Sequence, residues 1–207
     1  MTEEPHPIRI VVRDDLRRSR LTVLLRLVLV IPHILWLYWF SIGAFFVAIV
    51  NWFATVITGK PQPGMHDFLA RYVRYTIHLN AYLYLVANPF PGFLGIPGSY
   101  PLDLEIDGPA RQNRWVSGFR IPLALSAIVL AYVFGLVVFL VAVPGWFVAI
   151  GIGRIPKGMR DISAYCLRFQ GQTLGYLTLV TSRYPTLNAL AELGGETGYS
   201  EAPRVTS

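Results

Sequence analysis

Two long apolar stretches dominate the chain, and a short alternating segment precedes each of them. Arg26 and Arg120 each open a run of 33 residues without a charged side chain. The alternating segments are IRIVV at 8–12 and LDLEI at 102–106. A period of two predicts a β-strand with one buried face. The apolar runs are long enough to enter a membrane, which needs about 20 residues for one helix.

A constant offset of 94 residues relates the two halves of the chain. When residues 7–93 are laid on 101–187 without a gap, 24 positions are identical. A shared apolar bias would explain matching Leu and Val residues. It does not explain Arg, Trp, Gly and Asp in constant register, so the sequence indicates a tandem duplication.

This pattern predicts an all-α integral membrane protein in which each repeat holds a short strand, a transmembrane helical hairpin and an amphipathic interfacial helix. The expected boundaries are repeat one at 1–93, with a hairpin at 21–57 and an amphipathic helix at 67–87; repeat two at 94–187, with a hairpin at 116–152 and an amphipathic helix at 160–181; and a polar, disordered tail at 188–207.

The hairpins follow from length and charge. A single helix of 33 residues would be roughly 50 Å long, against a hydrocarbon core of about 30 Å. We therefore expect a turn near Trp36–Gly43 in repeat one and near Gly135 in repeat two. Two hairpins would also return all basic flanks to one side, as the positive-inside rule favours. We expect parallel repeats in a bacterial inner membrane, with both termini cytoplasmic.

The segments after the apolar runs have two interpretations. In DFLARYVRYTIHLNAYLYLV, apolar residues recur at helical spacing on one face, while Arg71, Arg74 and His78 lie on the other. An interfacial helix would let these side chains reach lipid phosphates. A third transmembrane helix packed against the bundle is the alternative, although it would bring arginines to membrane depth.

Composition supports a membrane protein. Of the 207 residues, 54% are hydrophobic and 14% charged, and the mean hydropathy is +0.47; soluble domains carry about 25% charged residues. The net charge is +6, and 16 of the 18 cations are arginine. Because these cations flank apolar runs, anionic lipid is a simpler partner than nucleic acid. One cysteine, Cys166, excludes an intrachain disulfide.

A nonapeptide occurs once in each repeat, as GKPQPGMHD at 59–67 and GRIPKGMRD at 153–161. It predicts a turn followed by a helix start, with Gly59, Gly64, Gly153 and Gly158 as turn or cap residues and Asp67 and Asp161 at the helix N-terminus. A second interpretation gives Lys60 or Arg154 and the helix N-terminus a lipid phosphate to bind. The candidate headgroup-binding residues are Arg17, Arg20, Arg26, Lys60, Arg71, Arg74, Arg111, Arg114, Arg120, Arg154, Lys157 and Arg168.

We find no catalytic constellation in the sequence and expect neither a metal nor a cofactor. GKPQPG lacks the GK[ST] ending of a phosphate-binding P-loop. His33, inside the first apolar run, is interpreted as a hydrogen-bonded structural residue rather than a proton relay, because neither run contains a carboxylate. Asn51 is expected to hold helices together.

Several segments resemble an uncharacterised bacterial membrane family, domain of unknown function 4389. They are RRSR at 17–20, RLVLVIPHILWLY at 26–38, TGKPQPGMHDF at 58–68 and AYLYLVANPFPGF at 81–93. SRYPTL at 182–187 matches the usual exit of that family, whereas repeat one has NPFPGF there, and repeat two lacks the Pro-His pair. The resemblance implies an integral membrane protein and brings no activity with it.

Three functions remain open at this point. The first is a non-enzymatic accessory or membrane-organising protein that contacts anionic lipids through a basic cytoplasmic face. A larger membrane protein complex and a homo-oligomer are both open as its setting. The second is a small oligomeric transporter or channel, which requires a polar path. The third is a membrane enzyme that acts on a lipid-like substrate, which requires a convergent acid and base.

Overall fold

The computed structural model describes residues 6–13 and 15–187. In the described part, the elements in chain order are β1 (Ile8–Val12), α1 (Arg20–Leu29), α2 (Ile31–Thr58), α3 (Pro63–Leu83), β2 (Leu102–Ile106), α4 (Arg114–Gly118), α5 (Arg120–Ile152) and α6 (Lys157–Leu177). Both strands occur where the alternation predicts them. The polar tail expected at 188–207 lies outside the described residues.

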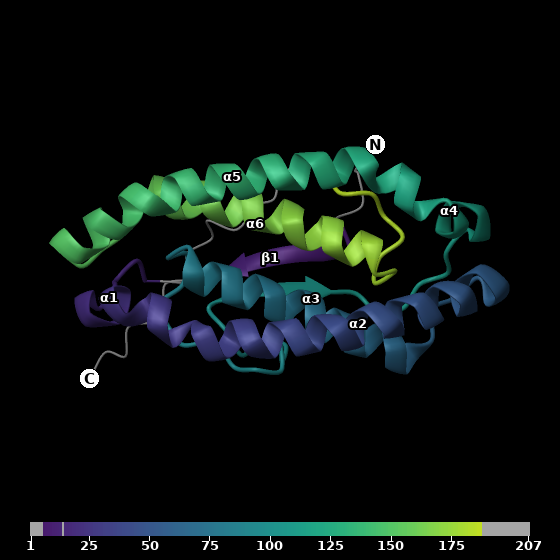
Figure 1. Ribbon diagram of the computed structural model, residues 1–207. Helices are drawn as coiled ribbons and strands as arrows, with labels where there is room; N and C mark the ends of the chain where they lie inside the picture. Colours follow the sequence, from purple (N-terminus) through teal and green to yellow (C-terminus); the bar gives the residue numbers. More distant parts are fainter. Residues whose placement is uncertain (1–5, 14, 188–207) are drawn as a thin grey trace, which may run out of the picture.

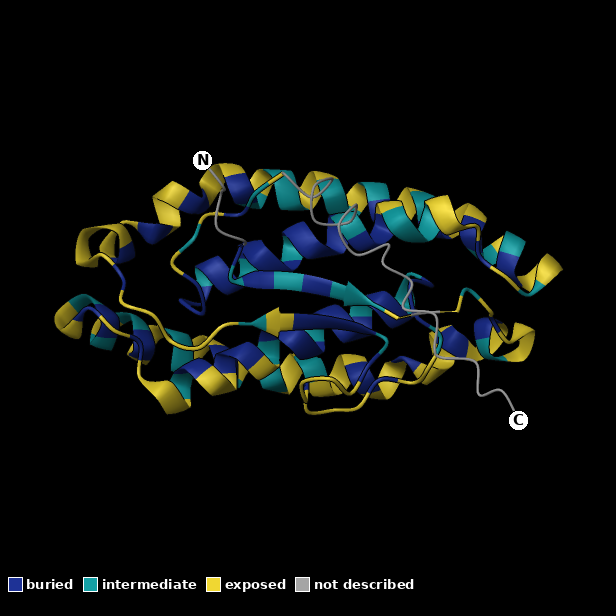
Figure 2. Ribbon diagram, turned by 180° about the vertical axis from the view of Figure 1, so that it is seen from behind, coloured by how far each residue is buried: buried dark blue, intermediate teal, exposed yellow. Residues whose placement is uncertain are grey.

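The elements form an elongated body in which the helices and strands run along one long direction (Figure 1). Helices α3 and α6 lie in the middle and pack against each other, and α2 and α5 run along the two outer edges. Seen from behind, the two-stranded sheet covers one face of the middle helices (Figure 2). Each long helix therefore runs alongside the sheet rather than away from it.

The predicted hairpins are wrong. α2 continues through Trp36–Gly43, and α5 continues through Gly135 for 33 residues. A Cβ on Gly43 would make an ordinary contact with the Phe68 ring at 3.7 Å, whereas one on Gly135 would lie closer, 3.2 Å from Gln170 Nε2. At 1.5 Å per residue, α5 is about 50 Å long.

The segments expected to be interfacial helices are helical but central. α3 and α6 are each packed between a long helix, the other middle helix and the sheet. On α3, Arg74 and His78 are buried and only Arg71 of the three expected headgroup-facing residues is exposed. A helical period shows which residues share a face, but it does not show whether lipid or protein covers that face.

The two repeats face in opposite directions, which corrects the expected parallel arrangement. β1 and β2 are antiparallel, and Ile10 pairs with Leu104, its own counterpart 94 residues later. The flanking pairs, Ile8 with Ile106 and Val12 with Leu102, are each other's images. Ile10 and Leu104 are both buried against the middle helices. A pseudo-twofold axis therefore passes through the centre of the sheet, perpendicular to it.

The nonapeptide forms the corner at each end of the body. Gly59 ends α2 and Gly153 ends α5, both in the left-handed conformation with φ of 75° and 72°, as suits glycine. Each corner is tied to the other repeat: Gln112 N donates to Gly59 O at 2.9 Å, and Arg18 N donates to Gly153 O at 2.8 Å. The duplicated peptide thus joins a long helix to a middle helix and also joins the repeats.

The sheet register gives a direct test of how the repeats are joined. In a Cys166→Ser background, cysteines at Arg9 and Glu105, which face each other across the strands, should be linked by a short bifunctional thiol reagent, since opposed Cβ atoms lie about 5 Å apart. Cysteines at Arg13 and Glu105 should not be linked, because Arg13 pairs with Pro101. Equal linking of both pairs, measured by intact mass, would contradict the register.

Candidate functional site: an apolar surface with basic ends and a charged sheet

An extensive apolar surface covers the outer sides of α1, α2 and α5. One side of α2 packs on α3 through residues such as Ala44, while the opposite side exposes Trp39 (67%) and Phe45 (62%). α5 follows the same rule, with Phe147 74% exposed. Soluble monomers rarely expose contiguous apolar patches of this kind. α2 and α5 are both long and apolar enough to cross a membrane.

Eight of the twelve candidate headgroup-binding residues are exposed, and seven of them lie at the two ends of the body. Arg17, Arg20, Arg154 and Lys157 surround the corner at Gly153, and Lys60, Arg111 and Arg114 surround the corner at Gly59; the eighth, Arg71, lies on α3. The corners are images of each other. Arg20 Nε lies 3.8 Å from where a Cβ on Gly153 would be, and Arg114 Nε lies 3.5 Å from the same point on Gly59.

The other four arginines are buried, so the structure contradicts a headgroup role for them. The guanidinium of Arg26 donates to the carbonyls of Tyr82 and Ala87 and lies 4.3 Å from the Tyr82 ring centroid. Arg120 repeats this arrangement, with Tyr176 O at 2.5 Å, Thr181 O at 2.8 Å and the Tyr176 ring at 4.4 Å. These arginines add charged donors to carbonyls at the ends of α3 and α6, where Tyr82 O and Tyr176 O also accept from the amides of Leu85 and Leu179.

Arg74 and Arg168, the remaining pair, are also internal. Arg74 donates to Leu104 O at 3.0 Å, and Arg168 donates to Thr186 O at 3.1 Å.

The backbone just after each middle helix has the same conformation in both repeats: Leu85 and Leu179 adopt φ of 63° and 61°. A left-handed leucine is uncommon, and the arginine donors that hold the surrounding carbonyls explain why it is tolerated twice.

The other predicted turn and cap residues are less uniform. Gly64 and Gly158 lie in the first turns of α3 and α6 and are absent from the residues with positive φ. Asp67 and Asp161 lie just past those first turns. Asp161 pairs with Arg160 at 2.6 Å, whereas Asp67 Oδ1 is 3.6 Å from His66 Nδ1.

Two buried polar residues of α2, His33 and Asn51, are hydrogen-bonded, whereas the hydroxyl of the third, Thr55, has no hydrogen-bond partner among the described residues. His33 Nδ1 is 2.8 Å from Tyr75 Oη, and its ring stacks on Phe93 with centroids 4.2 Å apart. Asn51 Oδ1 accepts from Gln62 N at 3.2 Å, across the corner. These contacts join α2 to α3 and to the linker between the repeats.

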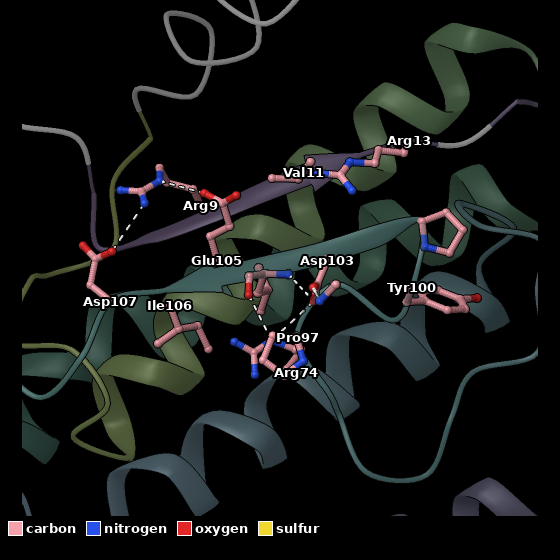
Figure 3. A pocket seen from close by; sticks show the side chains of 13 residues that line it. Arg9, Val11, Arg13, Arg74, Pro97, Tyr100, Asp103, Glu105, Ile106 and Asp107 are labelled. Atoms are coloured by element: carbon pink, nitrogen blue, oxygen red, sulfur yellow. Dashed lines mark hydrogen bonds and ion pairs between the residues drawn. The ribbon is translucent and has the colours of Figure 1, made fainter. Parts of the chain in front are cut away.

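The outer face of the sheet is charged and hollowed by a pocket of about 390 Å³ (Figure 3). Arg9 contacts Glu105 at 3.4 Å and Asp107 at 3.3 Å at one side of it. Beneath Pro97, Asp103 pairs with Arg74 at 3.3 Å and with His78 Nε2 at 2.8 Å. Arg9, Glu105 and Asp107 are accessible to water, whereas Asp103, Arg74 and His78 are largely buried.

Asp103 fastens the linker between the repeats. It accepts from the Gly98 amide and from Leu104 N, while Arg74 donates to Gly95 O. Burial alone would raise the pKa of Asp103, but the bonds from His78 and Gly98 hold that pKa below its usual range. Gly95 is required here, because a Cβ would meet Arg71 O at 2.2 Å.

We call the cluster of Arg74, His78 and Asp103 the clasp, because it holds the linker against α3. Nε2 of His78 is bonded to Asp103, and the other ring nitrogen, Nδ1, is buried. The His78 ring therefore offers no nitrogen to a ligand in the pocket. Within the described residues, no group of three His, Cys, Asp or Glu side chains is placed to hold a metal ion.

The repeat geometry agrees with a comparison against family models. The model of a domain of unknown function (DUF4389) matches residues 20–94 and again 114–187. The chain belongs to the DUF4389 family. Each match begins at the helix before a long apolar helix and ends after the exit of α3 or α6, so one DUF4389 unit is one structural repeat without its strand. Searches of curated proteins and of solved structures found no match.

Sequence reasoning missed the clasp and the role of Arg18, which donates to the carbonyls of Leu85 and Val86. The repeat comparison carries no signal for the clasp. His78 and Asp103 correspond to Gln172 and Arg9, but most positions differ between the repeats, so this pair of differences does not stand out.

The buried arginines should matter for stability and the exposed ones should not. We expect Arg26→Gln or Arg120→Gln to lower the free energy of unfolding by about 2 kcal/mol, because charged donors to buried carbonyls are lost. Arg20→Gln, at an exposed position on α1, should change it by less than about 0.5 kcal/mol. Thermal unfolding in mild detergent measures all three, and equal effects would contradict the buried role.

The clasp should make stability depend on acid. The folded-state pKa of Asp103 is lowered, so its stabilisation is present above the unfolded pKa, near 3.8, and is lost as pH falls through the folded value. Asp103→Asn should cost about 3 kcal/mol at neutral pH by leaving Arg74 unpaired and should weaken the acid dependence. Glu105→Gln, in an exposed pair, should cost less than about 1 kcal/mol. A variant with unchanged acid dependence would exclude Asp103 as its source.

Proposed function

We propose that the protein is a non-enzymatic, membrane-organising protein that lies within one leaflet. In this proposal α2 and α5 lie lengthwise in the membrane plane, their apolar outer sides are in contact with lipid, and the charged face of the sheet meets water. The expected multi-pass hairpin topology is replaced by a monotopic arrangement of the same apolar segments.

The observation that carries this proposal is the charged sheet beside the middle of both long helices. The pseudo-twofold passes through the Ile10–Leu104 pair and relates α2 to α5, and the sheet lies beside the middle of the elongated body (Figure 2). A five-residue strand is about 17 Å long, which fits wholly inside a core of about 30 Å. If the helices crossed upright, Arg9, Glu105 and Asp107 would sit in hydrocarbon, at a cost of several kcal/mol each.

The direction of the pseudo-twofold supports the same orientation. With the helices in the membrane plane, the axis runs along the membrane normal and both repeats meet lipid in the same way. An upright molecule would have inverted repeats, an arrangement found in many transporters. The transport alternative thus needs the orientation that the charged sheet disfavours.

The exposed cations extend the proposal to a partner and a location. In the membrane plane, both basic corners lie at headgroup depth, where Lys and Arg attract anionic lipid. We place the protein in the cytoplasmic leaflet of a bacterial inner membrane, with both termini on the cytoplasmic side. The body would act as a wedge in one leaflet, and its charged face would remain available to a membrane partner.

Labelling of the two corners tests the orientation. In a Cys166→Ser background, cysteines at Lys60 and Arg154 occupy equivalent places at opposite ends of the body. We expect a membrane-impermeant maleimide to label both in inside-out vesicles and neither in intact spheroplasts. Glu105→Cys, on the sheet, should behave in the same way.

Labelling of Lys60→Cys and Arg154→Cys from opposite sides would show an upright protein and refute the proposal. Recovery of the unmodified protein in the soluble fraction after cell lysis would refute membrane insertion altogether.

A further inference from the structure

An apolar groove runs along α5 on the side where α5 meets α1 and α3. Its volume is about 480 Å³, and its lining includes Leu27, Tyr84, Val143 and Phe147 without a charged residue. A second hollow of about 590 Å³ shares Tyr84 and continues along α5 toward Gly135. Both volumes suit a small-molecule ligand.

The groove ends beside the basic corner at Gly153. Ile150, the last α5 residue in the groove, lies one turn before Arg154. Arg20 reaches the same corner, with Nε 3.8 Å from the Cβ position on Gly153. Arg20 and Arg154 are exposed, and neither side chain contacts a carboxylate among the described residues. One end of the apolar groove therefore lies beside two cations.

We propose that this groove binds one acyl chain of an anionic phospholipid whose phosphate is held between Arg20 and Arg154. The charge complementarity selects this occupant, because an apolar partner helix would gain nothing from two cations at the mouth of the groove. From Phe139 to Ile150 the groove follows about 16 Å of helix, a length that suits an extended hydrocarbon chain. The inference rests on the membrane orientation proposed above and adds a specific lipid site to it.

Native mass spectrometry of the full chain in mild detergent, titrated with phosphatidylglycerol or phosphatidylcholine, tests the site. We expect one phosphatidylglycerol to remain bound at low lipid concentration. Val143→Trp, which fills the groove, should weaken this binding about tenfold. Leu35→Trp, on the exposed side of α2, is the matched control and should leave it unchanged.

Two double variants examine the headgroup end. The Arg20→Gln, Arg154→Gln double variant should lose the preference for phosphatidylglycerol. The Lys60→Gln, Arg114→Gln double variant removes the same charge at the other corner and should retain it.

The outcomes separate this site from the proposed function. Loss of the bound lipid in Val143→Trp, with vesicle flotation unchanged, would support the groove. Equal binding of phosphatidylcholine, equal loss in Leu35→Trp, or no retained lipid while flotation persists would overturn the groove and leave the membrane orientation standing. Failure of flotation in the unmodified protein would overturn the orientation as well.

Discussion

Ile10 on β1 pairs with Leu104 on β2, its own counterpart in the other repeat, and this antiparallel pairing fixes the direction of every other element. It turns two copies of one unit into halves related by a pseudo-twofold. It also ties a charged sheet to the middle of two long apolar helices. In the orientation proposed above, lipid covers the apolar sides of α2 and α5 and water covers β1 and β2, so no charge is carried into hydrocarbon.

Arginines hold this arrangement together from inside. Arg26 and Arg120 donate to the carbonyls at the ends of α3 and α6 and lie over the rings of Tyr82 and Tyr176. Guanidinium suits this position because its several donors can bond to a cluster of carbonyls at once, some of which also accept from a backbone amide. Seven exposed cations gather at the two corners. A basic, arginine-rich composition thus serves two purposes that charge counting alone cannot separate.

The sequence was informative wherever a pattern depends on local chemistry. Alternation located both strands, the constant offset revealed the duplication, and the glycines at 59 and 153 indicated the corners. It failed at Gly43 and Gly135, where length suggested a turn but both glycines lie within continuous helices. It also failed for Arg74 and His78, because a polar face on an isolated helix cannot reveal that Asp103 from the other repeat covers it. Those contacts depend on the antiparallel pairing of the repeats, which no local pattern encodes.

The common direction of all elements makes the orientation measurable in one experiment. In aligned bilayers containing the protein, polarised infrared spectroscopy reports the angle between the helix axes and the membrane normal. Since α2, α3, α5 and α6 run along one direction (Figure 1), their amide signals should add rather than cancel. The account predicts amide I dichroism of helices lying in the membrane plane. Dichroism of helices aligned with the normal would contradict it.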